Sequence, residues 1–108
     1  MSVQIRAKGL TLQDSTKAHI ENAIAAFEKF GLNITKVQVV LDAEKKGVHV
    51  EFNIHVAHEQ PVIINQHDDD LDTAIDLAID RATNALSRLH DKHADHKKTS
   101  IKDLEVEA

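Results

Sequence analysis

Apolar and polar residues alternate along three segments of the chain. The alternation is clearest over Val48–Val56, where Val, Phe or Ile fills every second position and His, Glu or Asn fills the positions between. It recurs over Val3–Lys8 and Thr35–Asp42. Because successive side chains of a strand point to opposite faces, these segments are predicted to be strands with one apolar face. Gln60–Asn65 is a shorter predicted strand. Pro61 places it at a sheet edge or marks its start, since proline cannot donate to a ladder.

Two other segments repeat apolar residues every three or four positions, which is the spacing of one helix face. The first is Leu12–Phe30, and Gly31 is placed to end it because glycine accepts the left-handed conformation of a helix cap. The second runs from about Asp70 to His93 or beyond. Its first turns are rich in Asp and its last turns in Arg, Lys and His, which suits the helix dipole. Its apolar stripe consists of Leu71, Ile75, Ala78, Ala82, Leu86 and Leu89.

The predicted elements follow the order β-α-β-β-β-α, which is an α+β arrangement. The connection Ala43–Gly47 is short and charged, so the strands on either side of it are expected to form a hairpin. One face of the sheet is apolar, so a four-stranded sheet with both helices packed on that face is expected. Residues 1–98 are predicted to form a single domain. Residues 99–108 have few apolar side chains to bury and are predicted to form a flexible acidic tail.

The composition excludes several classes of protein. The chain has three phenylalanines and no Trp, Tyr or Cys, so its core must be aliphatic and it has no disulfide, thiolate nucleophile or thiolate metal site. No run approaches the roughly 20 apolar residues of a membrane span, and no apolar segment follows Arg6 and Lys8 as a secretion signal requires. We therefore expect a soluble cytoplasmic protein that has no membrane partner.

Charge is distributed in blocks, although the formal net charge is −5. Gln66–Asp80 carries six acids and no base. Arg81–Lys98 carries two acids, three histidines and five bases, namely Arg81, Arg88, Lys92, Lys97 and Lys98. A positive patch can therefore exist on an acidic protein, and nucleic acid stays a possible partner.

Neither the histidines nor the aspartates form a convincing metal site. His90, His93 and His96 recur every third residue, and steps of about 300° drift around a helix, so no third ligand is predicted. The cluster Asp68–Asp72 lacks the closing Glu of a calcium loop, and a helix cap with acids in the first turn explains it better. The three glycines are isolated and no serine lies in an elbow-type turn, so no enzyme, cofactor or small-molecule substrate is expected.

One basic row remains as a candidate site. Arg81, Arg88 and Lys92 are separated by seven and four positions, so they share one face of the predicted second helix. Such a row can follow a phosphate backbone, each base releasing a counterion. Taken alone, however, a row of Arg and Lys on a helix is more often an ordinary solvated surface than a binding site. Because no Tyr or Trp accompanies the row, any RNA contact is expected to read backbone and shape rather than bases.

The element order and several local strings resemble the ribosome hibernation promoting factor family, and within it the short ribosome-associated inhibitors. The strongest string is Asp70–Asp76, followed by Ile79–Arg81 and Leu86–Arg88. Val37–Leu41 resembles the second strand of the family. Thr99–Glu107 is similar to the acidic tail of its short inhibitors. The resemblance covers essentially the whole chain.

This resemblance implies a fold like that of double-stranded-RNA-binding domains and a role in silencing translation under stress or in stationary phase. It implies binding to the small ribosomal subunit and the intact ribosome, in the decoding channel where mRNA and the A- and P-site tRNAs would lie. The mechanism would be steric occlusion, with bases paired to phosphates of 16S-type ribosomal RNA. The implied RNA-binding residues are Lys17, Arg81, Arg88 and Lys92, with possible additional contacts from Lys8, His90 and Lys97.

Three positions depart from the family pattern. Asn84 stands where the family has Arg, His90 where some members have Lys, and Asp72 where Tyr is typical. Fewer phosphate contacts are therefore expected. The alternative is a divergent paralogue that acts as a protein-interaction module through the acidic face of Asp68–Asp80.

Overall fold

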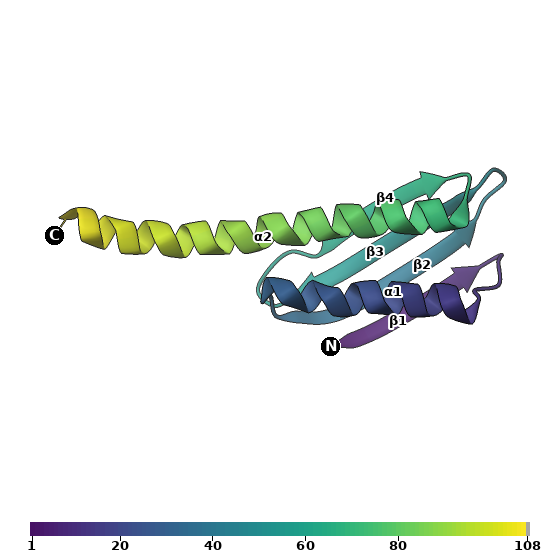
Figure 1. The fold of residues 1–108 in the computed structure, drawn as a ribbon, viewed down its shortest axis with the longest axis horizontal. Coiled ribbons are helices and arrows are strands. Elements are labelled where there is room, and N and C mark those ends of the chain that lie inside the picture. The colour runs from purple at the N-terminus through teal and green to yellow at the C-terminus, as the bar shows by residue number, and fades with distance from the viewer. Residues whose placement is uncertain (108) are drawn as a thin grey trace.

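The structure is a computed structural model that describes the backbone of residues 1–107 and the side chains of residues 1–92. Within that part the elements follow the predicted order, with one additional 3-10 helix, η1 (Figure 1). The bounds are β1 (Ser2–Lys8), α1 (Asp14–Ala26), η1 (Phe27–Phe30), β2 (Ile34–Ala43), β3 (Val48–Val56), β4 (Val62–Asp68) and α2 (Leu71–Glu107).

The four strands form one mixed sheet in the order β1-β2-β3-β4. β1 pairs parallel with β2, because α1 carries the chain back before β2 begins, whereas β2–β3 and β3–β4 are antiparallel. The predicted hairpin between β2 and β3 is confirmed. β1 and β4 are the edges of the sheet, and Pro61 directly precedes β4, as its missing N–H led us to expect.

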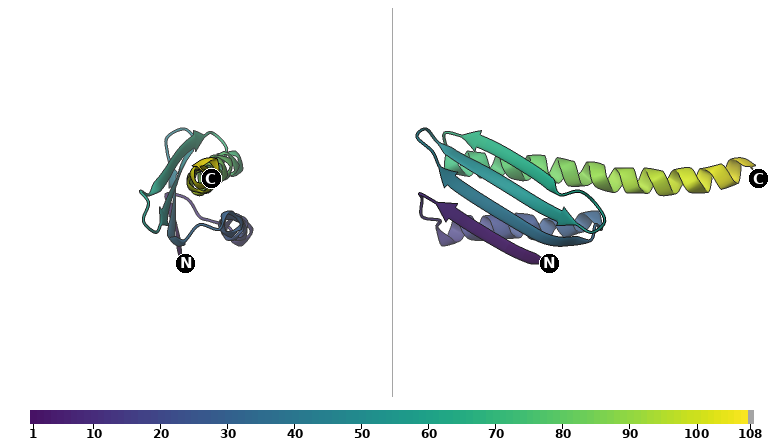
Figure 2. Two further views of the ribbon diagram at one scale, coloured as in Figure 1. Left: turned by 90° about the vertical axis from the view of Figure 1, so that its left-hand side faces the viewer. Right: turned by 180° about the vertical axis from the view of Figure 1, so that it is seen from behind.

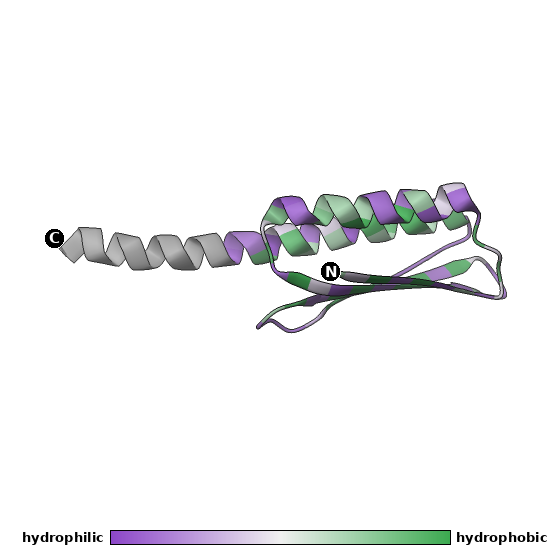
Figure 3. Ribbon diagram, turned by 90° about the horizontal axis from the view of Figure 1, so that it is seen from below, coloured by the Kyte–Doolittle hydropathy of each residue, from purple (hydrophilic) through white to green (hydrophobic). Residues whose placement is uncertain are grey.

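Both helices lie side by side on one face of the sheet, which confirms the predicted fold class (Figures 2 and 3). The strand alternation explains this arrangement, because Val50, Phe52 and Ile54 of β3 are fully buried under the helices. The other face of β3 consists of half-buried polar residues. Phe52 meets Phe27 edge to face, with ring centroids 6.5 Å apart, so the core is not purely aliphatic as expected but includes an aromatic pair.

Several predicted boundaries were wrong. The helix expected over Leu12–Phe30 begins at Asp14, and its last turn tightens into η1, a common way for a helix to end. Gly31 does cap it, with φ 66° in the left-handed region. The last strand begins after Pro61 and continues to Asp68, because its polar half pairs with β3 from Val48 onwards.

α2 packs on the sheet through small residues. Ala74, Ala78 and Ala82 have no exposed surface, and Leu86, one turn after Ala82, is equally buried. No helix in the described part of the chain combines the length and apolar character of a membrane span. The predicted boundary between a domain of residues 1–98 and a tail of 99–108 falls inside α2, beyond the described side chains, and stays a prediction.

Candidate nucleic-acid interface

The predicted basic row lies on the flank of α2 that faces the β4 edge, and its members do different things. Arg81 reaches across to β4, where its Nη1 donates to the carbonyl oxygen of Asn65 and to Oε1 of Gln66, the latter at 3.1 Å. Because β4 is an edge of the sheet, Arg81 covers part of an otherwise unpaired strand. Its guanidinium therefore already has protein partners.

Arg88 and Lys92 lie one turn apart on this flank and line a cleft between α2 and the β3–β4 turn. The α2 wall consists of Ala85, Arg88, Leu89 and Lys92. The opposite wall consists of Glu59, Gln60 and Val62. Arg88 and Lys92 are exposed, whereas Val62, Ala85 and Leu89 are half-buried. The structure thus brings two of the predicted RNA-binding residues together at a hollowed surface.

Lys17 does not join this group. His19 on α1 donates from Nε2 to Oδ1 of Asp76 on α2 at 2.8 Å, which identifies the side of α1 that faces α2. Two residues correspond to about 200° around a helix, so Lys17 projects from the side of α1 away from α2. The structure therefore separates Lys17 from Arg88 and Lys92 by the width of the two-helix layer.

The three possible additional contacts are also dispersed. Lys8 is exposed at the end of β1, in register with Asp42 of β2. His90 is exposed on α2, and its Nδ1 lies 3.3 Å from Oδ1 of Asp91. Lys97 lies outside the described side chains, as do His93 and His96. None of the three is placed in the cleft by the described part of the chain.

Acidic residues form an exposed row along α2. Asp72, Asp76 and Asp80 are exposed and recur every fourth residue of α2. Asp72 and Asp76 share a shallow notch with Ser15, Thr16 and His19 of α1. Asp72 and the exposed Asn84, further along α2, are departures from the family pattern, so the exposed side of α2 carries less positive charge than the resemblance implies.

The aspartate cluster before α2 caps the helix, as predicted. Oδ2 of Asp70 accepts from the backbone N–H and the hydroxyl of Thr73, both at 2.9 Å. These two bonds, the backbone one first, hold the pKa of Asp70 below its ordinary value. Oδ2 of Asp68 accepts from the N–H of Asp70. Among residues 1–92 no three His, Asp or Glu side chains converge as a metal site would require.

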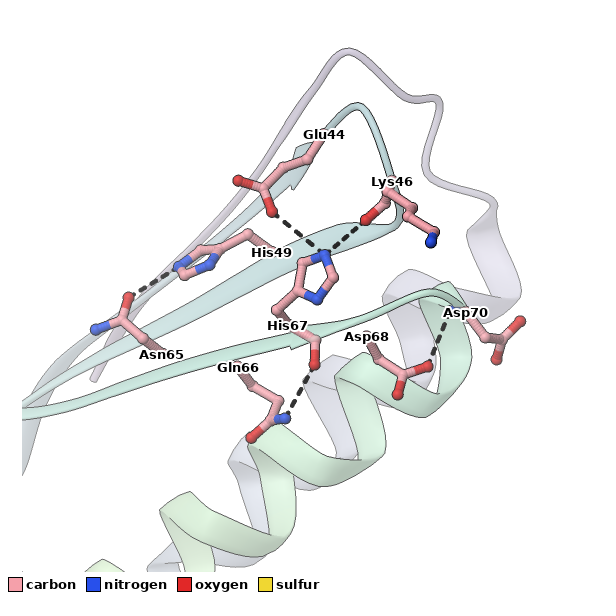
Figure 4. Close-up of polar contacts among 8 residues, drawn as sticks. All are labelled: Glu44, Lys46, His49, Asn65, Gln66, His67, Asp68 and Asp70. Atoms are coloured by element: carbon pink, nitrogen blue, oxygen red, sulfur yellow. Dashed lines mark hydrogen bonds and ion pairs between the residues drawn. The ribbon is translucent and has the colours of Figure 1, made fainter.

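Histidines fasten the β2–β3 hairpin to β4 at the same end of the sheet (Figure 4). Nε2 of His67 donates to the carbonyl oxygen of Lys46 at 2.6 Å and lies 3.5 Å from Oε1 of Glu44. Nε2 of His49 donates to Oδ1 of Asn65 at 2.9 Å. These contacts are structural, and none of their residues lines the cleft, so they do not contribute to it.

The sequence did not predict the wall of the cleft opposite α2. Glu59, Gln60 and Val62 are more than 20 positions before Arg88 in the chain, and no motif links them to it. Pro61 indicated an edge strand at this point, but only the packing of α2 beside β4 brings the β3–β4 turn against Arg88.

Comparison with known proteins agrees with this fold. Residues 3–94 match the family described as Sigma 54 modulation protein / S30EA ribosomal protein. A ribosome hibernation promoting factor from Azotobacter vinelandii is 30% identical over 92 residues, which is 85% of each chain.

Two solved structures share the architecture at low identity. The N-terminal domain of protein Y from Thermus thermophilus superposes with a TM-score of 0.72 and 23% identity, covering 82% of this chain and 99% of that one. A ribosomal subunit interface protein from Coxiella burnetii superposes with a TM-score of 0.71 and 15% identity, covering 82% of this chain and 97% of that one. These two likenesses support the fold.

The family match extends from β1 into α2 and includes every strand. The relative from Azotobacter vinelandii aligns over the same share of both chains, so neither match is a local motif. The family resemblance found in the sequence is confirmed: this chain belongs to the Sigma 54 modulation protein / S30EA ribosomal protein family.

Proposed function

We propose that this chain is a ribosome hibernation factor that binds the small subunit and silences translation by occupying a site rather than by chemistry. The observation that carries the proposal is the whole-domain relationship to a ribosome hibernation promoting factor. In this proposal the protein acts in the cytoplasm under stress or in stationary phase. It fills the decoding channel, so that mRNA and the A- and P-site tRNAs are excluded sterically.

The phosphate contacts of this proposal come from few side chains. Arg88 and Lys92 are exposed on one flank, and Lys17 is exposed on the other. Arg81 already bonds to β4 and contributes less. With about three phosphates neutralised, the slope of log affinity against log salt should be about −2 to −3. Binding should therefore be weaker and less salt-sensitive than that of a fully basic helix layer.

The first experiment is cosedimentation of the purified protein with vacant ribosomes and separated subunits through sucrose gradients at several salt concentrations. We expect the protein in the small-subunit and intact-ribosome fractions. Arg88→Glu should reduce that binding and lower the salt slope by about one. Lys45→Glu is the matched control, because it makes the same charge change at an exposed hairpin residue far from the cleft. Protein that stays in the top fractions at low salt would overturn the proposal.

A second function is favoured by the acidic row on the exposed side of α2. The exposed row of Asp72, Asp76 and Asp80 suits a basic polypeptide, so the domain would act as a protein-interaction module. Asp80→Lys separates the two functions. It should strengthen RNA binding by removing repulsion, and it should abolish capture of a basic partner.

A further inference from the structure

The cleft beside Arg88 has a chemical character that phosphate binding alone does not explain. It is an open cleft of about 480 Å³ that combines an apolar floor of Val62, Ala85 and Leu89 with the cations of Arg88 and Lys92 and the carboxylate of Glu59. This volume lies in the range of small-molecule sites, which are mostly apolar with a few polar groups placed at the rim. A site for a bare phosphate would need the cations and not the floor.

We propose that this cleft holds one nucleotide of an RNA strand, with the base on the apolar floor and the adjoining phosphate at Arg88 and Lys92. The proposal rests on the proposed function and names a ligand subsite within it. The guanidinium plane of Arg88 can stack on the base, as arginine does in recognition of unpaired RNA. The amide of Gln60, exposed on the opposite wall, offers both a donor and an acceptor to the base edge.

The position of the cleft favours a nucleotide within a strand over a free nucleotide. Sites for free nucleotides commonly use a helix N-terminus or a glycine-rich loop to hold a highly charged terminal phosphate. The cleft lies beside the middle of α2, many turns from its N-terminus at Leu71, and no glycine lines it. Arg88 and Lys92 together with the carboxylate of Glu59 give the cleft lining a formal charge of +1, which matches the single negative charge of a phosphodiester and not the additional charge of a terminal phosphate.

The binding test is an NMR titration of the full chain that follows backbone amide shifts. The probes are a single-stranded tetranucleotide, nucleoside 5′-monophosphates and ribose 5-phosphate, which has no base. We expect shifts at Val62, Ala85 and Leu89, with ribose 5-phosphate bound about tenfold more weakly than the nucleotides. Equal affinities for the sugar phosphate and the nucleotides would reduce the site to a cation pair. Tighter binding of the free nucleotides than of the tetranucleotide would show that the cleft holds a free nucleotide and not a nucleotide of an RNA strand. Either result overturns the proposal, as would shifts elsewhere or none.

The variant test fills the floor and keeps every charge. Ala85→Leu should weaken tetranucleotide binding about tenfold, because the added side chain occupies the place of the base. Asn84→Leu is the matched control, since it adds the same side chain at the exposed neighbouring position and should change binding less than twofold. Circular dichroism checks that both variants are folded. Equal binding by the two variants would overturn the proposal.

Failure of this inference and failure of the proposed function are distinguishable. If the parent protein cosediments with ribosomes and the tetranucleotide does not shift the cleft residues, the inference fails and the function stands. If the tetranucleotide binds in the cleft and the protein does not cosediment, the ribosomal function fails and the nucleotide site stands.

Discussion

His19 on α1 and Asp76 on α2 are 57 positions apart in the sequence and form a 2.8 Å hydrogen bond between the two helices. Their side chains are 57% and 63% exposed, so water screens the pair strongly. A double-mutant cycle with His19→Ala and Asp76→Ala, followed by urea unfolding, should give a coupling free energy of about 0.2–1 kcal/mol. A coupling above about 2 kcal/mol would mean that this contact, rather than the apolar core, holds the helices together.

Ionisation of Asp70 should make part of the free energy of unfolding depend on pH in the acidic range. Its folded pKa is lowered from 3.8 by the bonds from Thr73, so the ionised form is favoured in the folded state. The stability that this bond pattern contributes is fully present at pH values above the pKa of Asp70 in the unfolded chain. It is lost as the pH falls through the lower pKa of the folded state.

Two measurements check this prediction. The carboxyl ¹³C resonance of Asp70 should titrate at lower pH than that of an unstructured aspartate. Asp70→Ala should lower the urea midpoint near neutral pH and lower it less at acidic pH, whereas Asp70→Asn should keep much of the cap because asparagine also caps helices. A loss from Asp70→Ala that is independent of pH would contradict the assigned cause.

Arg81 and Arg88 should separate stability from binding. Arg81→Ala removes two hydrogen bonds to β4 and should lower the free energy of unfolding by about 1 kcal/mol. Arg88→Ala should change it by less than about 0.5 kcal/mol, because Arg88 is exposed. In ribosome cosedimentation the order should reverse, with Arg88→Ala binding more weakly than Arg81→Ala. Equal stability of the two variants would show that the β4 contact does not matter in solution.

Ala78 tests how closely α2 approaches the sheet. It has no exposed surface, and it faces the strands between Ala74 and Ala82. Ala78→Leu adds apolar volume where there is no room and should therefore destabilise the fold by about 1–3 kcal/mol in urea unfolding. Ala25→Leu on α1 is the matched control, since Ala25 is exposed and the same change should cost less than about 0.5 kcal/mol. A stabilised Ala78→Leu variant would indicate an unfilled space under α2.

Much of the fold was predictable because it is encoded in local periodicity. The alternation over Val48–Val56 predicted β3 with its correct bounds, and the stripe that includes Ala78 and Leu86 predicted the buried face of α2. The boundaries that were wrong depend on distant partners. β4 continues to Asp68 because Val48 of β3 is there to pair with it, and no short-range pattern records that pairing.

The candidate site divides in the same way. Spacing alone determined that Arg81, Arg88 and Lys92 share a flank of one helix, because helical geometry fixes which neighbours in sequence are neighbours in space. Only the tertiary structure decided that Arg81 bonds to β4, that Lys17 lies on the far side of α1, and that Gln60 faces Arg88 across a cleft. Those relationships depend on how two helices settle on one sheet. Burial of apolar surface drives that packing. The spacing of polar residues along the chain therefore does not show which of them the packing brings together.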